Sequence, residues 1–367
     1  MLKTSSKPKE TRRQRTTGFD VEIAGVAVAV PEHKVSQQDI AERAKAVFPH
    51  LARLGTLYSN TGIETRYACQ PKDWYYERHG WEARTEVFQR HALALLEEVT
   101  LAALANAGIG LKDLSALVVN TITGLAIPSL DAKLMNRLKF PQSVERIPIF
   151  GLGCGGGVAG LARAARYAQA MPPDSHVLFL TVDLCSLCLR IADPSMAMFV
   201  SAALFGDGAA GVVLRHEERA KDGGEGRSRI VAVGDHFWPN TERIMGWDIK
   251  EDGFGVVLSP ELPALIRKHL APAVRGFLDA NGMSLGEFTG FLLHPGGAKI
   301  LKTAQSVLGL SRSDLALSAS ILRDFGNMSS PTALFALDRA IKQGAKGPHL
   351  LIAFGPGFSA YFVAIDL

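Results

Sequence analysis

Three residues of this sequence combine a chemically active side chain with a turn that could present it. Cys154 lies among glycines in FGLGCGGGVAGL, His294 lies in LLHPGGAKI, and Asn327 lies in FGNMSSPTAL. A cysteine thiolate is a strong nucleophile, an imidazole can activate it, and an asparagine amide can donate to a developing oxyanion. The residue types therefore indicate nucleophilic catalysis. Each residue alone also fits a structural role, as a buried thiol, a core histidine or a helix N-cap.

The segment around Cys154 predicts a turn suited to a thiolate. Its glycines permit a strained turn and let a substrate approach the backbone closely. The alanine-rich run that follows, Val158–Ala170, predicts a helix whose N-terminal N–H groups point at the sulfur. Such a helix terminus lowers the pKa of a thiol, and so does a neighbouring imidazolium. We therefore expect the pKa of Cys154 to be lowered.

An internal duplication predicts the fold class. Residues 105–121 resemble residues 279–295 at an offset of 174, and residues 175–183 resemble residues 348–356 at an offset of 173. The second pair are short apolar runs without alternation, as expected of strands buried on both faces. Strands that alternate with helices indicate an α/β fold with parallel pairing. The duplication adds an expected pseudo-twofold symmetry.

The same pattern places the three residues at one edge of the sheet. Each follows an apolar segment that we expect to be a strand, at residues 147–150, 290–293 and 315–325. Ligands of open α/β sheets bind beyond the carboxyl ends of strands. Cys154 and Asn327 are also 173 residues apart, so they occupy near-equivalent points of the two halves. We therefore expect the three side chains to meet.

Composition excludes several classes of protein. The chain has 367 residues, of which 47% are hydrophobic and 21% charged, which is typical of globular proteins. No apolar run reaches the ~18 residues of a membrane span, and the N-terminus lacks the apolar core of a secretory signal. Four cysteines are too few for a disulfide scaffold. We expect a cytoplasmic protein with no integral membrane association.

The net charge of +4 comes from the N-terminus. Residues 1–17 contain six basic residues and one acidic residue, so the other 350 residues sum to −1. We expect a basic disordered tail at 1–17, with a nucleic-acid or membrane-surface arm as the alternative. The rest of the chain lacks the positive charge of a nucleic-acid binder, so we expect no nucleic-acid partner.

Several ordered motifs carry a resemblance to a known family. They are GLGCGGG, ALFGDGAAG, LLHPGG, GNMSSP and AFGPGFS. Over residues 20–367 the sequence resembles the type III polyketide synthases, the chalcone and stilbene synthase superfamily within the thiolase fold. The resemblance implies an α/β fold of five layers, α-β-α-β-α, duplicated with pseudo-twofold symmetry. It implies an N-terminal half at 18–228 with the cysteine and a C-terminal half at 229–367 with the histidine and asparagine.

The resemblance also implies a reaction. Cys154, as a thiolate paired with protonated His294, takes an acyl group from an acyl-CoA. His294 and Asn327 then hold the thioester carbonyl of malonyl-CoA while it loses CO2, and the carbanion attacks the acyl group on Cys154. Repeated extension gives a poly-β-keto chain that cyclises in the cavity. This chemistry implies a homodimer with CoA thioesters as substrates, no metal and no bound redox cofactor.

Matching positions suggest which residues line the substrate cavity. Phe205 matches a gatekeeper aromatic, and Val256 stands where plant members carry a second aromatic, which implies a wider cavity mouth. Ile127 matches a residue that enters the partner subunit's cavity across the dimer interface. The other expected cavity residues are Cys185, Cys188, Thr123, Ser329, Gly355 and Pro356. The residues expected to bind CoA are Arg66, Lys299, Gly296 and Gly297.

The choice of substrate is left open by the sequence. The segments DWYYERHGWEARTEVF and TVDLCSLCLR resemble the bacterial branch that includes alkylresorcinol and alkylpyrone synthases, which favours a fatty acyl starter. A tetrahydroxynaphthalene-type synthase that uses malonyl-CoA alone is an alternative. The motif TGIETR resembles ketoacyl synthase III enzymes, which perform a single condensation.

Three further readings of the motifs compete with this chemistry. Gly151, Gly153 and Gly156 satisfy G-x-G-x-x-G and Asp183 ends a later strand, so a Rossmann-type NAD oxidoreductase is a distant alternative. A non-catalytic acyl-CoA-binding protein is another. Cys185 and Cys188 form a C-x-x-C pair that redox or zinc chemistry could use, although no second pair exists.

Overall fold

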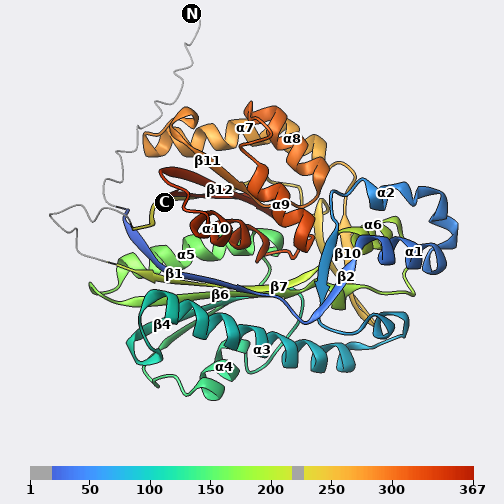
Figure 1. Ribbon diagram of the computed structural model, residues 1–367, viewed down its shortest axis with the longest axis horizontal. Helices are drawn as coiled ribbons and strands as arrows, with labels where there is room; N and C mark the ends of the chain where they lie inside the picture. Colours follow the sequence, from blue (N-terminus) through green and yellow to red (C-terminus); the bar gives the residue numbers. More distant parts are fainter. Residues whose placement is uncertain (1–18, 217–226) are drawn as a thin grey trace, which may run out of the picture.

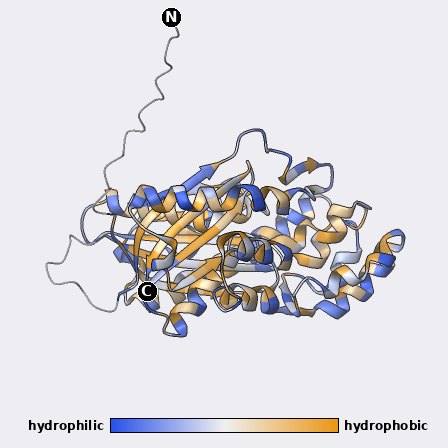
Figure 2. Cartoon of the chain, turned by 90° about the horizontal axis from the view of Figure 1, so that it is seen from above, coloured by the Kyte–Doolittle hydropathy of each residue, from blue (hydrophilic) through white to orange (hydrophobic). Residues whose placement is uncertain are grey.

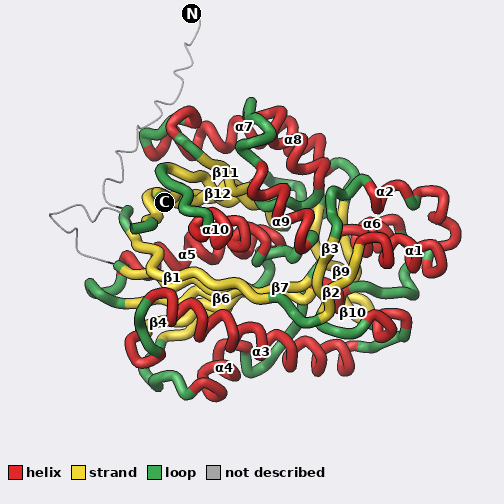
Figure 3. The backbone as a smooth tube through the Cα atoms, in the orientation of Figure 1, coloured by secondary structure: helices red, strands yellow, loops and turns green. Residues whose placement is uncertain are grey.

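Two leaves of one mixed β-sheet form the centre of the molecule (Figures 1 and 3). The computed structural model describes residues 19–216 and 227–367, so the expected basic tail lies outside the described residues. Strands β1 and β8 join the leaves through two residue pairs, Val21 with Ile230 and Glu22 with Arg229. In sheet order, the strands of the first leaf are β5 (Glu145–Ile149), β4 (Leu114–Asn120), β6 (His176–Leu184), β7 (Asp207–Arg215) and β1 (Val21–Ala29). Those of the second are β8 (Arg229–Phe237), β13 (Ser359–Asp366), β12 (Pro348–Gly355) and β11 (Gly290–Leu293).

Helices cover both leaves and fill the space between them. The helices outside the first leaf are α3 (Trp81–Ala107) and α4 (Leu130–Leu138), and those outside the second are α7 (Leu262–Asn281) and α8 (Ala298–Leu308). The helices between the leaves are α5 (Gly156–Ala170), α10 (Thr332–Lys342) and, beside α10, α9 (Ala316–Phe325). The result is the five-layered α-β-α-β-α arrangement that the resemblance implies.

The duplication is visible in the order of the elements. The first half runs β1, α3, β4, α5, β6, β7, and the second runs β8, α7, β11, α10, β12, β13. Parallel pairing holds only at the outer strands, where β4 pairs with β5 and β6, and β11 pairs with β12. The remaining pairs of the sheet are antiparallel. Strand β7 runs back alongside β6, and strand β13 runs back alongside β12. The prediction of parallel pairing was therefore wrong for the strands at the centre.

Three buried apolar clusters hold the layers together, and the strands at the centre of the molecule consist largely of hydrophobic residues (Figure 2). Leu96 of α3 and Leu117 of β4 belong to one buried cluster, and Leu270 of α7 and Leu350 of β12 belong to another. Between the leaves, the alanine-rich helix α5 belongs to one cluster with α10 and both leaves. Strands with a helical layer on each face bury both faces, which explains why their sequences show no alternation.

A smaller group of elements covers one end of the sheet, near the site described below (Figure 1). Tyr58 and Phe199 are fully buried in its apolar cluster. Its elements are β2 (His33–Ser36), α1 (Gln37–Val47), α2 (Thr56–Ser59), β3 (Thr65–Ala68), α6 (Met196–Leu204), β9 (Met245–Lys250) and β10 (Gly253–Leu258).

One predicted strand is a helix. Residues 316–325 form α9, and Asn327 follows this helix rather than a strand. The segment LALSASILRDF buries Ser318, Ile321 and Leu322, at the spacing of one helical face. A short apolar run fits either structure until its neighbours are known, which is why the prediction failed.

Candidate active site

Cys154 lies in a 3-10 turn, Gly153–Gly155, that leads directly into α5. The second half of the chain packs closely against this turn. A side chain at Gly153 would meet the ring of Pro356 at 2.3 Å, and one at Gly157 would meet the carbonyl oxygen of Ser330 at 2.0 Å. The expectation that the glycines leave room for a substrate was wrong for Gly153 and Gly157, because protein atoms fill that room, whereas a side chain at Gly151 would meet no atom within 4 Å. The glycines allow the two halves to meet beside the cysteine.

His294 ends strand β11 and is 2% exposed. Its backbone N–H donates to the carbonyl oxygen of Ile352 on β12 over 2.7 Å, so the sheet fixes its position. Neither ring nitrogen has a hydrogen-bond partner among the described residues. Burial lowers the pKa of His294 to about 4, so the imidazole is neutral at physiological pH. A buried neutral imidazole without a partner retains its capacity to accept a proton.

Asn327 connects the other two residues. Its Nδ2 donates to the carbonyl oxygen of Gly296, two residues after His294, over 3.3 Å. Its Oδ1 accepts the backbone N–H of Ser329 over 2.8 Å, and its side chain is one of the groups that lower the pKa of Cys154. Two backbone bonds of 2.9 Å hold Asn327 against the end of α6, from its N–H to Leu204 and from the Gly206 N–H to its carbonyl. Asn327 therefore lies between the end of α6 and the loop that follows His294.

The electrostatics of Cys154 differ from the expectation. Burial raises the pKa of Cys154 to about 11. The Ser329 side chain lowers this pKa, and the nearby Asp183 carboxylate raises it. The prediction of a lowered cysteine pKa was therefore wrong for the unliganded protein. With His294 also neutral, the resting pair is a thiol and an imidazole rather than a thiolate and an imidazolium. Both charges are disfavoured because the site is shielded from water.

A buried polar network behind Cys154 joins the two halves. Asp183, at the end of β6, is fully buried and accepts the backbone N–H groups of Ile122 over 2.8 Å and Ser330 over 3.0 Å. Asn120 Nδ2 donates to the Ser330 hydroxyl over 3.0 Å, and that hydroxyl donates to the Gly153 carbonyl over 2.8 Å. Roles for Asn120 and Ser330 were not predicted from the sequence. Their only local signal is a polar residue at the end of an apolar strand, for Asn120, or before a helix, for Ser330.

This network contradicts the Rossmann alternative. The Asp183 carboxylate is occupied by protein donors, so it offers no site for a ribose hydroxyl. A side chain at Gly156 would lie 2.5 Å from Asn120, so protein also fills the position where a pyrophosphate would approach.

The expected cavity residues surround this centre. Phe205 follows α6, and its ring centroid lies 6.3 Å from that of Trp247 on β9. Val256 pairs directly with Trp247 across the β9–β10 hairpin. Trp247 was missed by the sequence analysis because nothing local links it to Phe205.

The remaining expected cavity residues are mostly buried. Thr123 is 4% exposed, and its hydroxyl accepts the Leu184 N–H over 2.8 Å. Gly355 and Pro356 pack against the Cys154 turn. Cys185 and Cys188 are buried and free, and burial raises the pKa of both thiols. Among residues 19–216 and 227–367, no group of three or more His, Cys, Asp or Glu side chains is placed to hold a metal ion.

An apolar pocket opens beside Phe205. Its cavity volume is about 100 Å³, and it is partly open to solvent. Tyr75 and Ser186, joined by a 2.7 Å hydrogen bond between their hydroxyls, also line it. Its apolar wall includes Val35, Ile40, Ala44, Phe48, Leu189 and Phe205.

The residues expected to bind CoA divide into two groups. Lys299 is exposed in the first turn of α8, and Gly296 and Gly297 lie between it and His294. Arg66, by contrast, is 3% exposed. Its guanidinium donates to the carbonyl oxygens of Ala202, Ala203 and Phe205 over 2.8–3.0 Å. This geometry contradicts a role for Arg66 in binding a phosphate and makes it a structural residue of the Phe205 turn.

Ile127 is the most exposed large apolar side chain of the described residues, at 99%. Leu125 and Phe150 are also about half exposed. Within the described part of the chain, no helix is long and apolar enough to cross a membrane.

Comparison with known sequences assigns most of the chain to one family. Residues 7–217 match "Chalcone and stilbene synthases, N-terminal domain", and residues 229–365 match the corresponding C-terminal domain. A 1,3,6,8-tetrahydroxynaphthalene synthase of Streptomyces peucetius subsp. caesius is 36% identical over 364 residues, covering 97% of this chain and 96% of that protein. The "Alpha-pyrone synthesis polyketide synthase-like Pks18" of Mycobacterium tuberculosis is 28% identical over 358 residues, covering 94% and 91%.

Comparison with solved structures agrees. The crystal structure of 1,3,6,8-tetrahydroxynaphthalene synthase from Streptomyces coelicolor A3(2), a bacterial type III polyketide synthase, matches with a TM-score of 0.87 and 29% identity. The match covers 94% of this chain and 99% of that one.

Proposed function

Because this chain belongs to the chalcone and stilbene synthase family of type III polyketide synthases, we propose that Cys154, His294 and Asn327 are its catalytic residues. The observation that carries the proposal is the turn that begins at Asn327. Asn327 Nδ2 donates to the carbonyl of Gly296 beside His294, and the Ser330 hydroxyl donates to the carbonyl of Gly153 beside Cys154. One polar turn thus contacts both the loop of the nucleophile and the loop of the proposed base.

The loading step uses the neutral pair found in the resting site. As an acyl-CoA thioester approaches, His294 accepts the Cys154 proton and the sulfur attacks the acyl carbon. The new sulfur–carbon bond replaces the bond to CoA, and the departing CoA thiolate takes up the proton from His294. The raised pKa of Cys154 and the lowered pKa of His294 favour this late transfer over a standing ion pair.

The extension step uses the donors of His294 and Asn327. They hydrogen bond to the thioester oxygen of malonyl-CoA, where negative charge develops as the carbon–carbon bond to CO2 breaks. The resulting carbanion attacks the acyl carbon on Cys154, a new carbon–carbon bond forms, and the Cys154 thiolate leaves. We propose no metal, since the donors of His294 and Asn327 stabilise the developing charge, and no bound redox cofactor, since neither oxidation nor reduction occurs in these steps.

The proposed starter is a fatty acyl-CoA, and the product an alkylresorcinol or alkylpyrone. The apolar pocket beside Phe205 supports this choice, because it offers apolar wall for a methylene chain. Val256 supports it too, since a valine at this position fills less of the mouth than an aromatic side chain. A relative from M. tuberculosis is named for alpha-pyrone synthesis, which is in keeping with a pyrone product.

A second candidate is a synthase that uses malonyl-CoA alone. The 36% identity to a 1,3,6,8-tetrahydroxynaphthalene synthase favours it. In that case the acyl group on Cys154 would itself come from malonyl-CoA, and the apolar pocket would hold no starter chain.

Other features of the proposal concern binding and assembly. We propose that Lys299, Gly296 and Gly297 contact CoA, because the lysine is exposed beside the His294 turn. We propose a homodimer through the face that carries Ile127, because an isoleucine with 99% of its surface exposed is costly in water. Four free cysteines favour the cytoplasm, and the near-neutral body of the chain favours no nucleic-acid partner.

Product analysis tests the proposal. The purified protein is incubated with acyl-CoA of several chain lengths and labelled malonyl-CoA, and products are identified by mass spectrometry. We expect alkylated resorcinols or pyrones, no acyl adduct on Cys154→Ala, and a retained adduct on the control Cys69→Ala, which removes another buried thiol. Tetrahydroxynaphthalene from malonyl-CoA alone would establish the second candidate. A β-ketoacyl product alone would establish single condensation, and an acyl adduct on Cys154→Ala would remove this cysteine as nucleophile.

A further inference from the structure

The hairpin β9–β10 reaches Phe205 through a row of aromatic rings. The rings of Trp81 and Phe254 have centroids 4.9 Å apart, those of Phe254 and Trp247 are 5.9 Å apart, and those of Trp247 and Phe205 are 6.3 Å apart. Val256 pairs with Trp247 across the hairpin, so both side chains lie on one face of it. Strand β10 also contacts α6, which ends at Phe205. The position of this hairpin therefore sets how far Val256 and Trp247 lie from Phe205.

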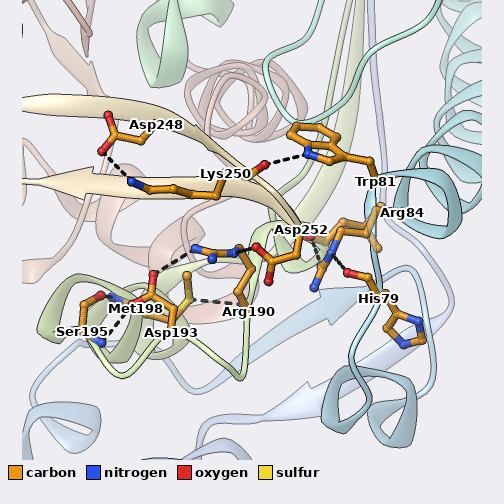
Figure 4. Close-up of polar contacts among 11 residues, drawn as sticks. His79, Trp81, Arg84, Arg190, Asp193, Ser195, Met198, Asp248, Lys250 and Asp252 are labelled. Carbon is orange, nitrogen blue, oxygen red and sulfur yellow. Dashed lines mark hydrogen bonds and ion pairs between the residues drawn. The ribbon is translucent and has the colours of Figure 1, made fainter.

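The hairpin is attached to the rest of the protein at its turn (Figure 4). Asp252 Oδ1 accepts a hydrogen bond from Arg190 Nε over 2.6 Å. Arg190 also bonds Asp193 through Nη1 over 3.1 Å, so it is held between two carboxylates. On the other side, Trp81 Nε1 donates to the carbonyl oxygen of Lys250 over 2.7 Å. Three segments meet here: the start of α3, the hairpin turn and the loop that precedes α6.

Arg190 lies where the cavity wall meets the surface. It follows Cys188 by two residues, and its side chain is 11% exposed, compared with 37% for Asp252. Arg190 and Ile191 line both the apolar pocket beside Phe205 and a polar surface cleft formed with Arg78 and Lys250. A partly buried guanidinium needs its carboxylate partners, because leaving it unpaired carries a desolvation penalty. The loop and the hairpin turn are therefore coupled through this ion pair.

We propose that Arg190 and Asp252 are positioning residues that fix the hairpin against the cavity and thereby set how far the polyketide chain grows. Neither residue touches the reacting atoms. They act through the hairpin, whose Val256 and Trp247 face Phe205, so a loosened turn changes the space available to the growing chain. This inference rests on the proposed function, because chain length has a meaning only for a condensing enzyme.

The variant Asp252→Asn tests the proposal, since it removes the charge and keeps the size of the side chain. We expect the ratio of products with different numbers of extensions to change about two- to fivefold, as loss of a partly exposed ion pair implies. The rate of acyl loading on Cys154 should not change. Asp252→Glu should restore the wild-type ratio. The matched control is Asp248→Asn in the same hairpin, which breaks the exposed ion pairs with Arg243 and Lys250 but keeps the Arg190–Asp252 pair, and it should leave the ratio unchanged.

A second measurement does not depend on activity. Hydrogen exchange of the amides of residues 245–258 should accelerate in Asp252→Asn and in Arg190→Gln, but not in Asp248→Asn. Unchanged exchange in the first two variants would overturn the anchoring role, and an unchanged product ratio in Asp252→Asn would overturn the link to chain length. An equal shift in Asp248→Asn would also overturn it. A wild-type protein that forms no polyketide would instead count against the proposed function.

Discussion

The Ser330 hydroxyl donates a hydrogen bond to the carbonyl oxygen of Gly153 over 2.8 Å, across the boundary between the two halves of the fold. Gly153 begins the turn that carries Cys154, and Ser330 closes the turn that begins with Asn327. The nucleophile and its proposed oxyanion donor are therefore positioned by direct contact between duplicated elements. The same hydroxyl accepts from Asn120, so one side chain holds two strand ends together.

Loss of this contact should affect both stability and loading. Ser330→Ala removes one of two partners from each group, because the Gly153 carbonyl also accepts the Gly156 N–H and the Asn120 amide also donates to Thr181. Loss of the two hydrogen bonds costs roughly 0.5–1.5 kcal/mol each. We expect a lower free energy of unfolding in urea and slower acyl transfer to Cys154. Ser59→Ala, which removes an exposed hydroxyl, is the control and should change neither quantity. Wild-type loading by a destabilised Ser330→Ala protein would show that the contact serves stability alone.

The raised pKa of Cys154 predicts a specific pH dependence of its reactivity. Only the thiolate is alkylated, and a pKa near 11 leaves little thiolate at neutral pH. The rate of Cys154 alkylation by iodoacetamide, followed on its peptide by mass spectrometry, should rise roughly tenfold per pH unit from pH 7 to 9. A plateau below pH 7 would contradict this prediction and show a standing thiolate–imidazolium pair.

Replacing His294 should separate catalysis from stability. Its ring nitrogens have no hydrogen-bond partner in the described structure, so His294→Leu loses no such bond and buries a side chain of similar size. We expect a free energy of unfolding within about 1.5 kcal/mol of wild type. Malonyl-CoA decarboxylation, measured as labelled CO2, should fall roughly 10²–10³-fold. A large loss of stability with retained decarboxylation would assign His294 a structural role.

The exposed lysine beside the His294 turn should matter for binding rather than for chemistry. Lys299→Ala should raise the KM for acyl-CoA and malonyl-CoA by roughly three- to tenfold with little change in kcat, because it removes one charged hydrogen bond to a phosphate. The control is Lys302→Ala, in the next turn of the same helix and also exposed. Equal KM values for wild type and Lys299→Ala would rule out this contact.

Much of the architecture was predictable because its signals are local. The duplication around residues 105–121 and 279–295 and the apolar runs of β6 and β12 are visible in short windows, and each was found as predicted. The motif around Cys154 indicated a nucleophile for the same reason, since glycines, a cysteine and an alanine-rich helix are adjacent in the chain.

What only the tertiary structure decided involves contacts between distant residues. The glycines beside Cys154 accommodate Pro356 and Ser330, Arg66 is buried against α6 rather than available to a phosphate, and α9 is a helix because of what it packs against. The pairing of Arg190 with Asp252 joins residues 62 positions apart. The pKa values of Cys154 and His294 also follow from burial, which depends on the whole fold. Local sequence determines which residues are available for chemistry, but burial and long-range packing determine their charge, their partners and the space around them.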